Sequence, residues 1–227
     1  MAAPQDGCPP GAVNVVMLGP PGAGKGTQAE RLSRTRKVPK ISTGDILREA
    51  VQGSTEIGGA AKATMEAGNL VGDDIMIAIV RDRLDRDDAR CGFVLDGFPR
   101  TVVQASALDD MVEGRGPVVV LDIVVPEDVL ARRLSTRRIC SKCGSNAAPD
   151  WTTACGKCGA ALVTRVDDGI DIVRERLKVY HRQTKPLVEY YAKWAASGDA
   201  RAPKYRKIDG ARDVDDVRAA ALAALES

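Results

Sequence analysis

Short apolar runs alternate with longer amphipathic stretches along this chain. Five runs have the length and the β-branched content of buried strands: VNVVML (13–18), VPKIS (38–42), GFVLD (92–96), PVVVLDIVV (117–125) and YRKID (205–209). Helical patterns separate them, over roughly 24–36, 57–67, 73–87, 101–113, 126–138 and 168–197, with an Ala-rich helix from about residue 211. This alternation predicts an α/β fold, in which a parallel sheet carries helices on both faces.

Two segments lie outside the alternating pattern. Residues 43–72 open a helix after Thr43, Gly44 and Asp45, and residues 138–167 contain cysteines and turn residues but show no helical period. The predicted organisation is a flexible tail over 1–12 and a core built from 13–42, 73–137 and 168–227, with the two segments inserted between its parts. In parallel sheets, ligands bind at the carboxyl ends of the strands.

The composition narrows the possible classes of protein. The 227 residues are 44% apolar and 28% charged, as in a soluble globule, and the net charge of +2 is too small to indicate a nucleic-acid or membrane surface. No apolar run approaches the roughly 20 residues of a membrane span. The start, MAAPQDGCPPG, lacks the pattern of a secretory signal, so a cytoplasmic, reducing location is expected.

A phosphate-binding loop follows the first predicted strand. Residues Gly19 to Lys25 fit the pattern G-x-x-x-x-G-K and lead directly into a helix. Glycines let backbone N–H groups approach phosphate oxygens, and Lys25 can reach the β- and γ-phosphates. A glycine-rich turn that binds nothing is the alternative. The hydroxyl comes one position late, at Thr27, so Mg²⁺ is expected to rely on water and on an acid elsewhere, for which Asp96 at the end of a strand is the candidate.

Four of the six cysteines form two C-x-x-C-G pairs, separated by eleven residues. Cys140, Cys143, Cys155 and Cys158 predict a four-sulfur tetrahedral site, for which Zn²⁺ is the default and iron the alternative. Because sulfur fills all four positions, the metal is expected to be structural. Two disulfides or unrelated thiols are the other interpretation. Cys8 and Cys91 have no partner in the pattern and are predicted to be single, one in the tail and one in a loop or packed.

Several motifs in this order resemble the adenylate kinase family: GPPGAGKGT (19–27), STGDILR (42–48), LDGFPR (95–100) with Gln104, and TRVDD (164–168) with Arg174 and Arg176. The resemblance covers about residues 13–225 and includes Gly26. It implies transfer of a phosphoryl group from MgATP to AMP, giving two ADP, by a P-loop NTPase-type core with a monophosphate-binding arm (43–72) and a mobile zinc-stabilised lid (138–167). It also implies a monomer whose partners are these nucleotides, and neither nucleic acid nor membrane.

The resemblance also assigns residues to the two nucleotides. ATP would contact Gly22, Ala23, Gly24, Lys25, Gly26, Thr27, Arg133, Arg137 and, through its backbone, Lys207. AMP would contact Thr43, Arg48, Asn69, Leu70, Val71, Gly97, Phe98, Pro99, Arg100, Gln104, Arg165 and Arg176. The catalytic set would be Lys25, Asp96, Arg100, Arg137, Arg165 and Arg176. Contacts to the ATP base are expected near Ser145 to Ala147, although the lid is shorter than is usual in the family.

These residue types suit phosphoryl transfer, which needs alignment and charge neutralisation more than covalent help. The forked donors of arginine match pairs of phosphate oxygens. Arg133 and Arg137 are four positions apart, which predicts one face of a helix, and Arg165 and Arg176 flank the far side of the lid. Arg132 and Arg138 are assigned to a solvated face. No general base is needed, and His181 is given no catalytic role.

Three other functions share parts of this pattern. A UMP/CMP or GMP kinase would have the same phosphate loop and LDGFPR, but Thr43, Gln104 and the cysteine-bearing lid favour AMP. A zinc-ribbon nucleic-acid binder with a P-loop switch would need a basic patch with interleaved aromatics, whereas aromatics make up 4% of the chain. A regulatory NTPase would lose ATP without any acceptor.

Overall fold

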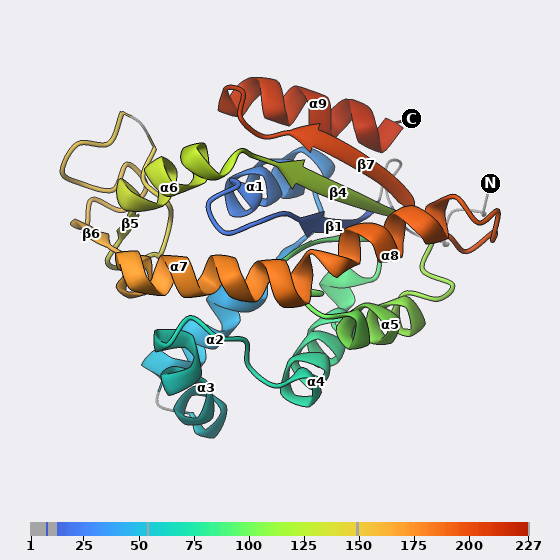
Figure 1. Ribbon diagram of the computed structural model, residues 1–227, viewed down its shortest axis with the longest axis horizontal. Coiled ribbons are helices and arrows are strands. Elements are labelled where there is room, and N and C mark those ends of the chain that lie inside the picture. Colours follow the sequence, from blue (N-terminus) through green and yellow to red (C-terminus); the bar gives the residue numbers. More distant parts are fainter. Residues whose placement is uncertain (1–7, 9–12, 54, 149, 227) are drawn as a thin grey trace.

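The computed structural model describes residues 8, 13–53, 55–148 and 150–226. Its main sheet has five parallel strands in the order β2-β3-β1-β4-β7 (Figure 1). The strands are β1 (Asn14–Leu18), β2 (Lys40–Ser42), β3 (Phe93–Asp96), β4 (Val118–Val124) and β7 (Lys204–Asp209). All five predicted strands and the α/β fold are therefore confirmed.

Helices cover both faces of the sheet. They are α1 (Lys25–Arg36), α2 (Thr43–Gln52), α3 (Glu56–Glu66), α4 (Asp73–Leu84), α5 (Val102–Met111), α6 (Glu127–Ser135), α7 (Ile170–Val179), α8 (Pro186–Ala195) and α9 (Val214–Glu226). Alternate strand residues point to opposite faces. Thus Val16 packs in one cluster with α4, α5 and α8, and Val15 packs in a second with α1, α6 and α9. Both clusters hold the strand ends in place for the site.

Two segments extend from the edge of the sheet where its strands end (Figure 1). The arm segment (43–72) contains α2 and α3, which pack so closely that a Cβ on Gly58 would lie 2.1 Å from the carbonyl oxygen of Ala50. The lid segment (138–167) contains the antiparallel strands β5 (Arg138–Cys140) and β6 (Leu162–Thr164) and the 3-10 turn η2 (Val166–Asp168). The arm segment and the lid segment therefore both lie near the carboxyl ends of the strands.

Two helices differ from the predicted ranges. The helix expected over 126–138 ends at Ser135, with Thr136 as its C-cap, and the chain then turns into β5. Arg137 therefore lies beyond the helix, and the prediction that it shares a helical face with Arg133 is wrong. The helical stretch expected over 168–197 starts at Ile170 and is interrupted by a π-turn, η3 (Tyr180–Thr184). Pro186 lacks an N–H, and the N–H of Lys185 bonds the carbonyl of Tyr180 at 2.8 Å.

The prediction of two single cysteines is also wrong, because Cys8 and Cys91 form a disulfide with their Cα atoms 5.1 Å apart. Residues before β1 and before β3 enter the parallel sheet side by side, and the N–H of Phe93 bonds the carbonyl of Val13 at 3.1 Å. This register brings together two cysteines that lie 83 residues apart in sequence. The rest of the predicted tail, 1–7 and 9–12, lies outside the described residues.

Candidate functional site

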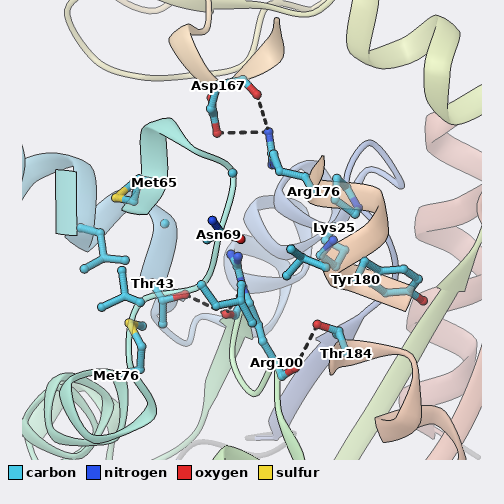
Figure 2. Close-up of a pocket in the computed structure, with 18 of the residues that line it drawn as sticks. Lys25, Thr43, Met65, Asn69, Met76, Arg100, Asp167, Arg176, Tyr180 and Thr184 are labelled. Carbon is cyan, nitrogen blue, oxygen red and sulfur yellow. Dashed lines mark hydrogen bonds and ion pairs between the residues drawn. The ribbon is translucent and has the colours of Figure 1, made fainter. Parts of the chain in front are cut away.

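A cavity of about 1040 Å³, including its open mouth, lies where the strands end (Figure 2). Its walls come from the loop after β1, the arm segment, the loop after β3, the end of the lid segment and the helices α7 and η3. The positively charged residues among its lining are Lys25, Arg48, Arg100, Arg165 and Arg176. An open cavity lined by five cationic side chains is suited to binding an anion such as a phosphate.

The phosphate loop joins β1 to α1 through backbone conformations that glycine adopts readily. Gly22 and Gly24 have φ of +84° and +94°, and a Cβ on Gly22 would lie 2.9 Å from the side chain of Leu134 in α6. Lys25 Nζ donates to the carbonyl oxygens of Gly19 at 2.7 Å and Pro20 at 2.9 Å. The lysine thus folds back over its own loop, at the N-terminus of α1, where an anion is favoured.

The surroundings of Lys25 disfavour the charged form of its side chain. The pKa of Lys25 is lowered to about 8, mainly by burial and also by the nearby cations Arg100, Arg176 and Arg137, while Asp96 opposes this shift. Burial also lowers the pKa of Arg176, to about 10. A bound polyanion would relieve both effects. The lowered pKa values of Lys25 and Arg176 are typical of cations gathered around a site for an anion.

The motif LDGFPR builds one wall of the cavity around the carbonyl of Gly97. This oxygen accepts the Thr43 hydroxyl at 2.9 Å and Arg100 Nε at 2.8 Å. Gly97 has a φ of +86°, and a Cβ there would lie 2.8 Å from the Thr43 hydroxyl oxygen, so no other residue fits without displacing it. The Thr184 hydroxyl, from the π-turn, bonds the carbonyl of Arg100 at 2.9 Å. Arg100 is thereby fixed from both sides.

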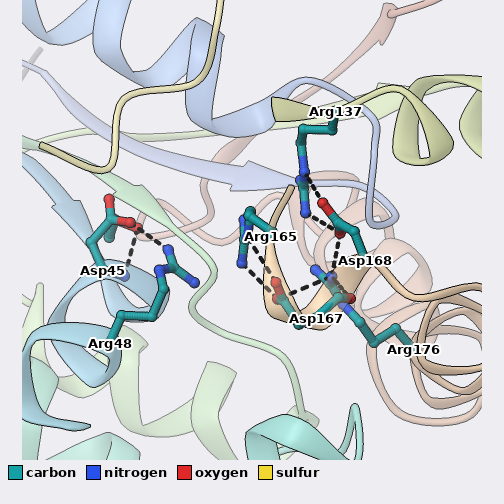
Figure 3. Close-up of polar contacts among 8 residues, drawn as sticks. Asp45, Arg48, Arg137, Arg165, Asp167, Asp168 and Arg176 are labelled. Carbon is teal, nitrogen blue, oxygen red and sulfur yellow. Dashed lines mark hydrogen bonds and ion pairs between the residues drawn. The ribbon is translucent and has the colours of Figure 1, made fainter. Parts of the chain in front are cut away.

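A second basic group lies where α2 begins. Ser42 caps α2 by accepting the N–H of Asp45 at 3.3 Å. Asp45 contacts Arg48 and lies 3.2 Å from Lys40 Nζ (Figure 3). Burial opposes ionisation of Asp45, but Lys40 and Arg48 outweigh it and lower the pKa of Asp45. Arg48 is therefore held at the cavity wall by a carboxylate that stays ionised.

Two neighbouring carboxylates gather three arginines at the end of the lid segment (Figure 3). Arg137 Nε donates to Asp168 at 2.7 Å, and Arg176 donates to the same carboxylate at 3.2 Å. Arg165 donates to Asp167 at 2.8 Å, and Arg176 also lies 3.1 Å from that side chain. The side chain of Asp168 is fully buried. Burial opposes ionisation of Asp167, yet Arg176 and Arg165 lower its pKa.

Sequence reasoning did not assign a role to either carboxylate, although both stand in the quoted motif TRVDD. An Asp-Asp pair beside basic residues was the available signal. Tyr180 and Thr184 were also missed, and both line the cavity because the π-turn directs them inward. Apolar residues that line the cavity were not named either: Leu47, Met65, Met76 and Val179.

The structure brings most of the expected monophosphate residues together. Those that line the cavity are Thr43, Arg48, Asn69, Leu70, Val71, Gly97, Pro99, Arg100, Gln104, Arg165 and Arg176. Phe98 differs, because its side chain is fully buried in the core cluster. Of the residues expected at ATP, Lys25 lines the cavity, Arg133 lies on α6 and Arg137 lies between α6 and β5. Lys207 is exposed on β7, opposite Asp122 of β4.

The phosphate loop lies close to Asp96, the expected acid, at the position of Gly26. A Cβ on Gly26 would lie 3.1 Å from Asp96 Oδ2 and 3.8 Å from Asn146 Nδ2. A side chain at residue 26 would therefore crowd Asp96, while Asn146 of the lid segment lies at contact distance. Lys157 of the lid segment also reaches Glu30 of α1, at 3.4 Å. These contacts place the lid segment over the phosphate loop.

The four cysteines of the two C-x-x-C-G pairs lie together, with all sulfur atoms within 4.8 Å of one another. The closest approaches are 3.4 Å between Cys140 and Cys158 and 3.6 Å between Cys143 and Cys155, so none of them forms a disulfide. Tetrahedral thiolates about 2.3 Å from a zinc ion would be roughly 3.8 Å apart. Backbone N–H groups of Cys143 and Lys157 point at Cys140 and Cys155 sulfur, at 3.3 and 3.4 Å. The donor set fits a four-sulfur metal.

No helix in the described part of the chain is both long and apolar enough to span a membrane.

Comparison with known proteins identifies a family. The family model described as adenylate kinase matches residues 17–196. A protein of Archaeoglobus fulgidus named adenylate kinase is 45% identical over 212 residues, covering 90% of this chain and 94% of its own length. An adenylate kinase of Caldicellulosiruptor bescii is 50% identical over 79% of this chain and 86% of its own length. An adenylate kinase of Clostridium acetobutylicum is 45% identical over 90% of this chain and 95% of its own length.

Proposed function

This chain belongs to the adenylate kinase family, and we propose that AMP binds in the cavity while the phosphate loop holds the phosphates of MgATP. The chain is an ATP:AMP phosphotransferase, which transfers the terminal phosphoryl group of ATP to AMP and gives two ADP. The observation that carries the site assignment is the set of five cationic residues lining one cavity: Lys25, Arg48, Arg100, Arg165 and Arg176. They offset the repulsion between two phosphorylated nucleotides.

On the donor side, the phosphates of ATP replace the backbone carbonyls that now hold Lys25. The ammonium would leave Gly19 and Pro20 and pair with the phosphates, while the N–H groups of the loop and the N-terminus of α1 contact the oxygens. A Mg²⁺ ion would be held by Asp96 and Thr27, partly through water, and supplies charge neutralisation on the phosphates. Gly26 fits this role, because it lets the loop approach Asp96 Oδ2.

On the acceptor side, Arg48 and Arg100 would hold the phosphate of AMP in line with the donor. Arg100 has a preformed position, since Gly97 and Thr184 bond it from two sides. The AMP phosphate is ionised at neutral pH and needs no general base, so its oxygen attacks directly. Thr43, Gln104 and the apolar residues Leu47, Val71 and Met76, which line the cavity, would enclose the adenine.

The arginines of the hinge would complete the site when both nucleotides are bound. Arg137, Arg165 and Arg176 are paired with Asp167 and Asp168, so they are already ordered and need only exchange a carboxylate for a phosphate. Arg133 would join Arg137 at ATP. We propose that the segments 43–72 and 138–167 act as a monophosphate-binding arm and a lid, and that closure excludes water from the transfer.

The four cysteines would hold a structural Zn²⁺ ion. All four ligands come from protein sulfur, so no position is free for water, and the metal would fix the shape of the lid rather than take part in transfer. We further propose a monomer, as the resemblance of the motifs to the family implies. A cytoplasmic location stays a prediction from the sequence.

The proposed acceptor is tested by measuring ADP formation from MgATP with AMP, GMP, UMP, CMP or no acceptor. We expect ADP formation to depend on AMP and to be at least about 100-fold weaker, in kcat/KM, with GMP and UMP, because a wrong base leaves buried polar groups unpaired. Equal rates with another monophosphate would contradict the AMP assignment. Loss of ATP without any acceptor would contradict the transferase mechanism and support a nucleotide hydrolase.

A further inference from the structure

Asp73 lies next to the acceptor cavity and has no role in the proposed mechanism. It is the first residue of α4, is partly buried, and is not among the residues that line the cavity. One of its carboxylate oxygens accepts Gln104 Nε2 at 2.8 Å, and the other accepts the Thr101 hydroxyl at 3.0 Å. Both partners belong to the start of α5, which follows LDGFPR.

The contacts of Gln104 determine which way its amide points. Gln104 is 1% exposed, and its Oε1 accepts the backbone N–H of Arg100 at 2.8 Å. A backbone N–H can only donate and a carboxylate can only accept, so the oxygen must face Arg100 and the nitrogen must face Asp73. Amide orientations are otherwise ambiguous in protein structures, but this pair of neighbours allows one assignment. Thr101 strengthens it, because its hydroxyl caps α5 and donates to the same carboxylate.

The fixed amide keeps one free hydrogen-bonding direction on each of its atoms, and Gln104 lines the cavity. It therefore offers an acceptor and a donor in a fixed order. The edge of a 6-aminopurine presents an amino donor and the ring acceptor N1. The edge of a 6-oxopurine presents the reverse, a carbonyl acceptor and an N1 donor. Rotation of the amide by 180° would exchange the two patterns, and Asp73 opposes that rotation.

We propose that Asp73 is a positioning residue that fixes the amide of Gln104, so that the acceptor site selects 6-amino over 6-oxo purine monophosphates. This inference rests on the proposed binding of AMP in the cavity. Without Asp73, the amide nitrogen loses its charged acceptor, and the contact with Arg100 is left as the single bond that resists the flip. A hydrogen bond to a charged group contributes enough to shift such a preference by a factor of about ten.

The test compares AMP with inosine monophosphate, which replaces the 6-amino group by an oxo group and carries a proton on N1. We expect Asp73→Ala to lower the ratio of kcat/KM for AMP over inosine monophosphate by about tenfold, with the change in the KM of the monophosphate rather than in kcat. Asp74→Ala is the matched control, because it removes the same charge from the same turn of α4 at an exposed position. It should leave the ratio unchanged.

A structural role alone would lower kcat/KM for both monophosphates equally, and an unchanged ratio in folded Asp73→Ala would overturn the proposal. Asp73→Asn covers the case in which the alanine variant unfolds, since it keeps the shape and one acceptor. It should lower the ratio by less than the alanine variant, and a ratio equal to that of the unaltered chain would overturn the proposal. If the unaltered chain itself does not prefer AMP, the proposed function fails instead.

Discussion

The core and the lid segment bury very different amounts of apolar surface. In the core, the strand residues Val15, Val16 and Leu95 are fully buried between two layers of helices. Among the described residues from 138 to 165, only Cys140 and Cys155 are buried, and Val163 of β6 is 41% exposed. Because a segment of this size has few buried apolar contacts, we propose that a metal bound by the four sulfurs stabilises it in place of a core.

This difference separates two tasks of the enzyme. The core holds Lys25 and Arg100 with hydrogen bonds that exist before any nucleotide binds. We propose that the lid segment opens and closes during the reaction; one of its contacts with the core is the ion pair between Lys157 and Glu30. Rigid packing provides accurate positioning, and a metal-fixed segment can move as one piece.

Loss of the phosphate-loop lysine is expected to have the largest effect, because it acts on the core alone. Lys25→Ala should lower kcat by about three orders of magnitude, since one preorganised positive charge is removed from the transferring phosphoryl group. The melting temperature should stay close to that of the unaltered chain or rise, because a buried charge is lost. Steady-state kinetics and calorimetry measure both. Lys62→Ala, at an exposed position of the arm segment, is the control. Retention of a tenth of the activity would refute the assigned role of Lys25.

Asp168→Asn tests the hinge at which the two regions meet. The substitution removes a buried charge that holds Arg137 and Arg176, so we expect kcat/KM for ATP to fall and the free energy of unfolding to drop by about 2 kcal/mol. Urea unfolding and kinetics give the two values. Asp171→Asn, where the exposed carboxylate pairs with Arg174 at 3.4 Å, should change neither. Equal effects of the two variants would mean that the hinge network has no special role.

The lowered pKa of Lys25 predicts a pH dependence that belongs to the core. Burial and the cations around it lower that pKa to about 8, so the nucleotide-free enzyme loses this charge above pH 8. ATP phosphates stay ionised there, and kcat/KM for ATP should fall by up to about tenfold per pH unit. The contribution of Lys25 to the free energy of unfolding should rise from pH 8 to 10.5, because the unfolded lysine still binds its proton.

The matched test of this pH effect is Lys25→Arg, in which the charge persists far above pH 8. Its activity is expected to be low, but its kcat/KM for ATP should lose the decline above pH 8. If the decline persists in Lys25→Arg, another group causes it.

The smallest effect is expected where the lid segment touches α1. Glu30→Gln removes the partner of Lys157, an exposed pair that contributes at most about 1 kcal/mol. The closed lid should become slightly less favourable, and the KM for ATP should rise by no more than about threefold at low salt. High salt should remove the difference between the variant and the unaltered chain. Glu226→Gln, which removes the partner of Arg36 far from the lid, is the control.

Local patterns explain how much of the molecule could be predicted from its sequence. The five strands, the phosphate loop and the two cysteine pairs each lie in a continuous stretch of sequence, so each could be predicted from its local pattern. The disulfide between Cys8 and Cys91 depends on the register of β1 against β3, which no local pattern shows. The helix α6 ends at Ser135, before Arg137, although the helical pattern of the sequence runs on to residue 138.

The residues of the candidate site also fall into two groups, those in local motifs and those in long-range pairs. Most of the expected monophosphate residues lie in quoted motifs, and the cavity brings them together. Asp73 and Asp168 act through side-chain pairs that are 31 residues apart in each case, with Gln104 and Arg137. Long-range pairs of this kind require the fold before they can be recognised. Phe98 shows the opposite error, because its motif suggested a contact and its side chain lies in the core.

The two tryptophans allow a direct test of the contrast between core and lid. Trp151 packs over Gly156 in the lid segment, and Trp194 packs against the core cluster and Tyr190. We would record thermal unfolding by fluorescence in Trp151→Phe and Trp194→Phe, each with and without a zinc chelator. We predict that chelation lowers the melting temperature reported by Trp151 by roughly ten degrees or more and shifts the one reported by Trp194 much less. Cys155→Ser should reproduce this split without chelator. Equal shifts at both tryptophans, or no shift at Trp151, would contradict the claim that a metal takes the place of a core in the lid.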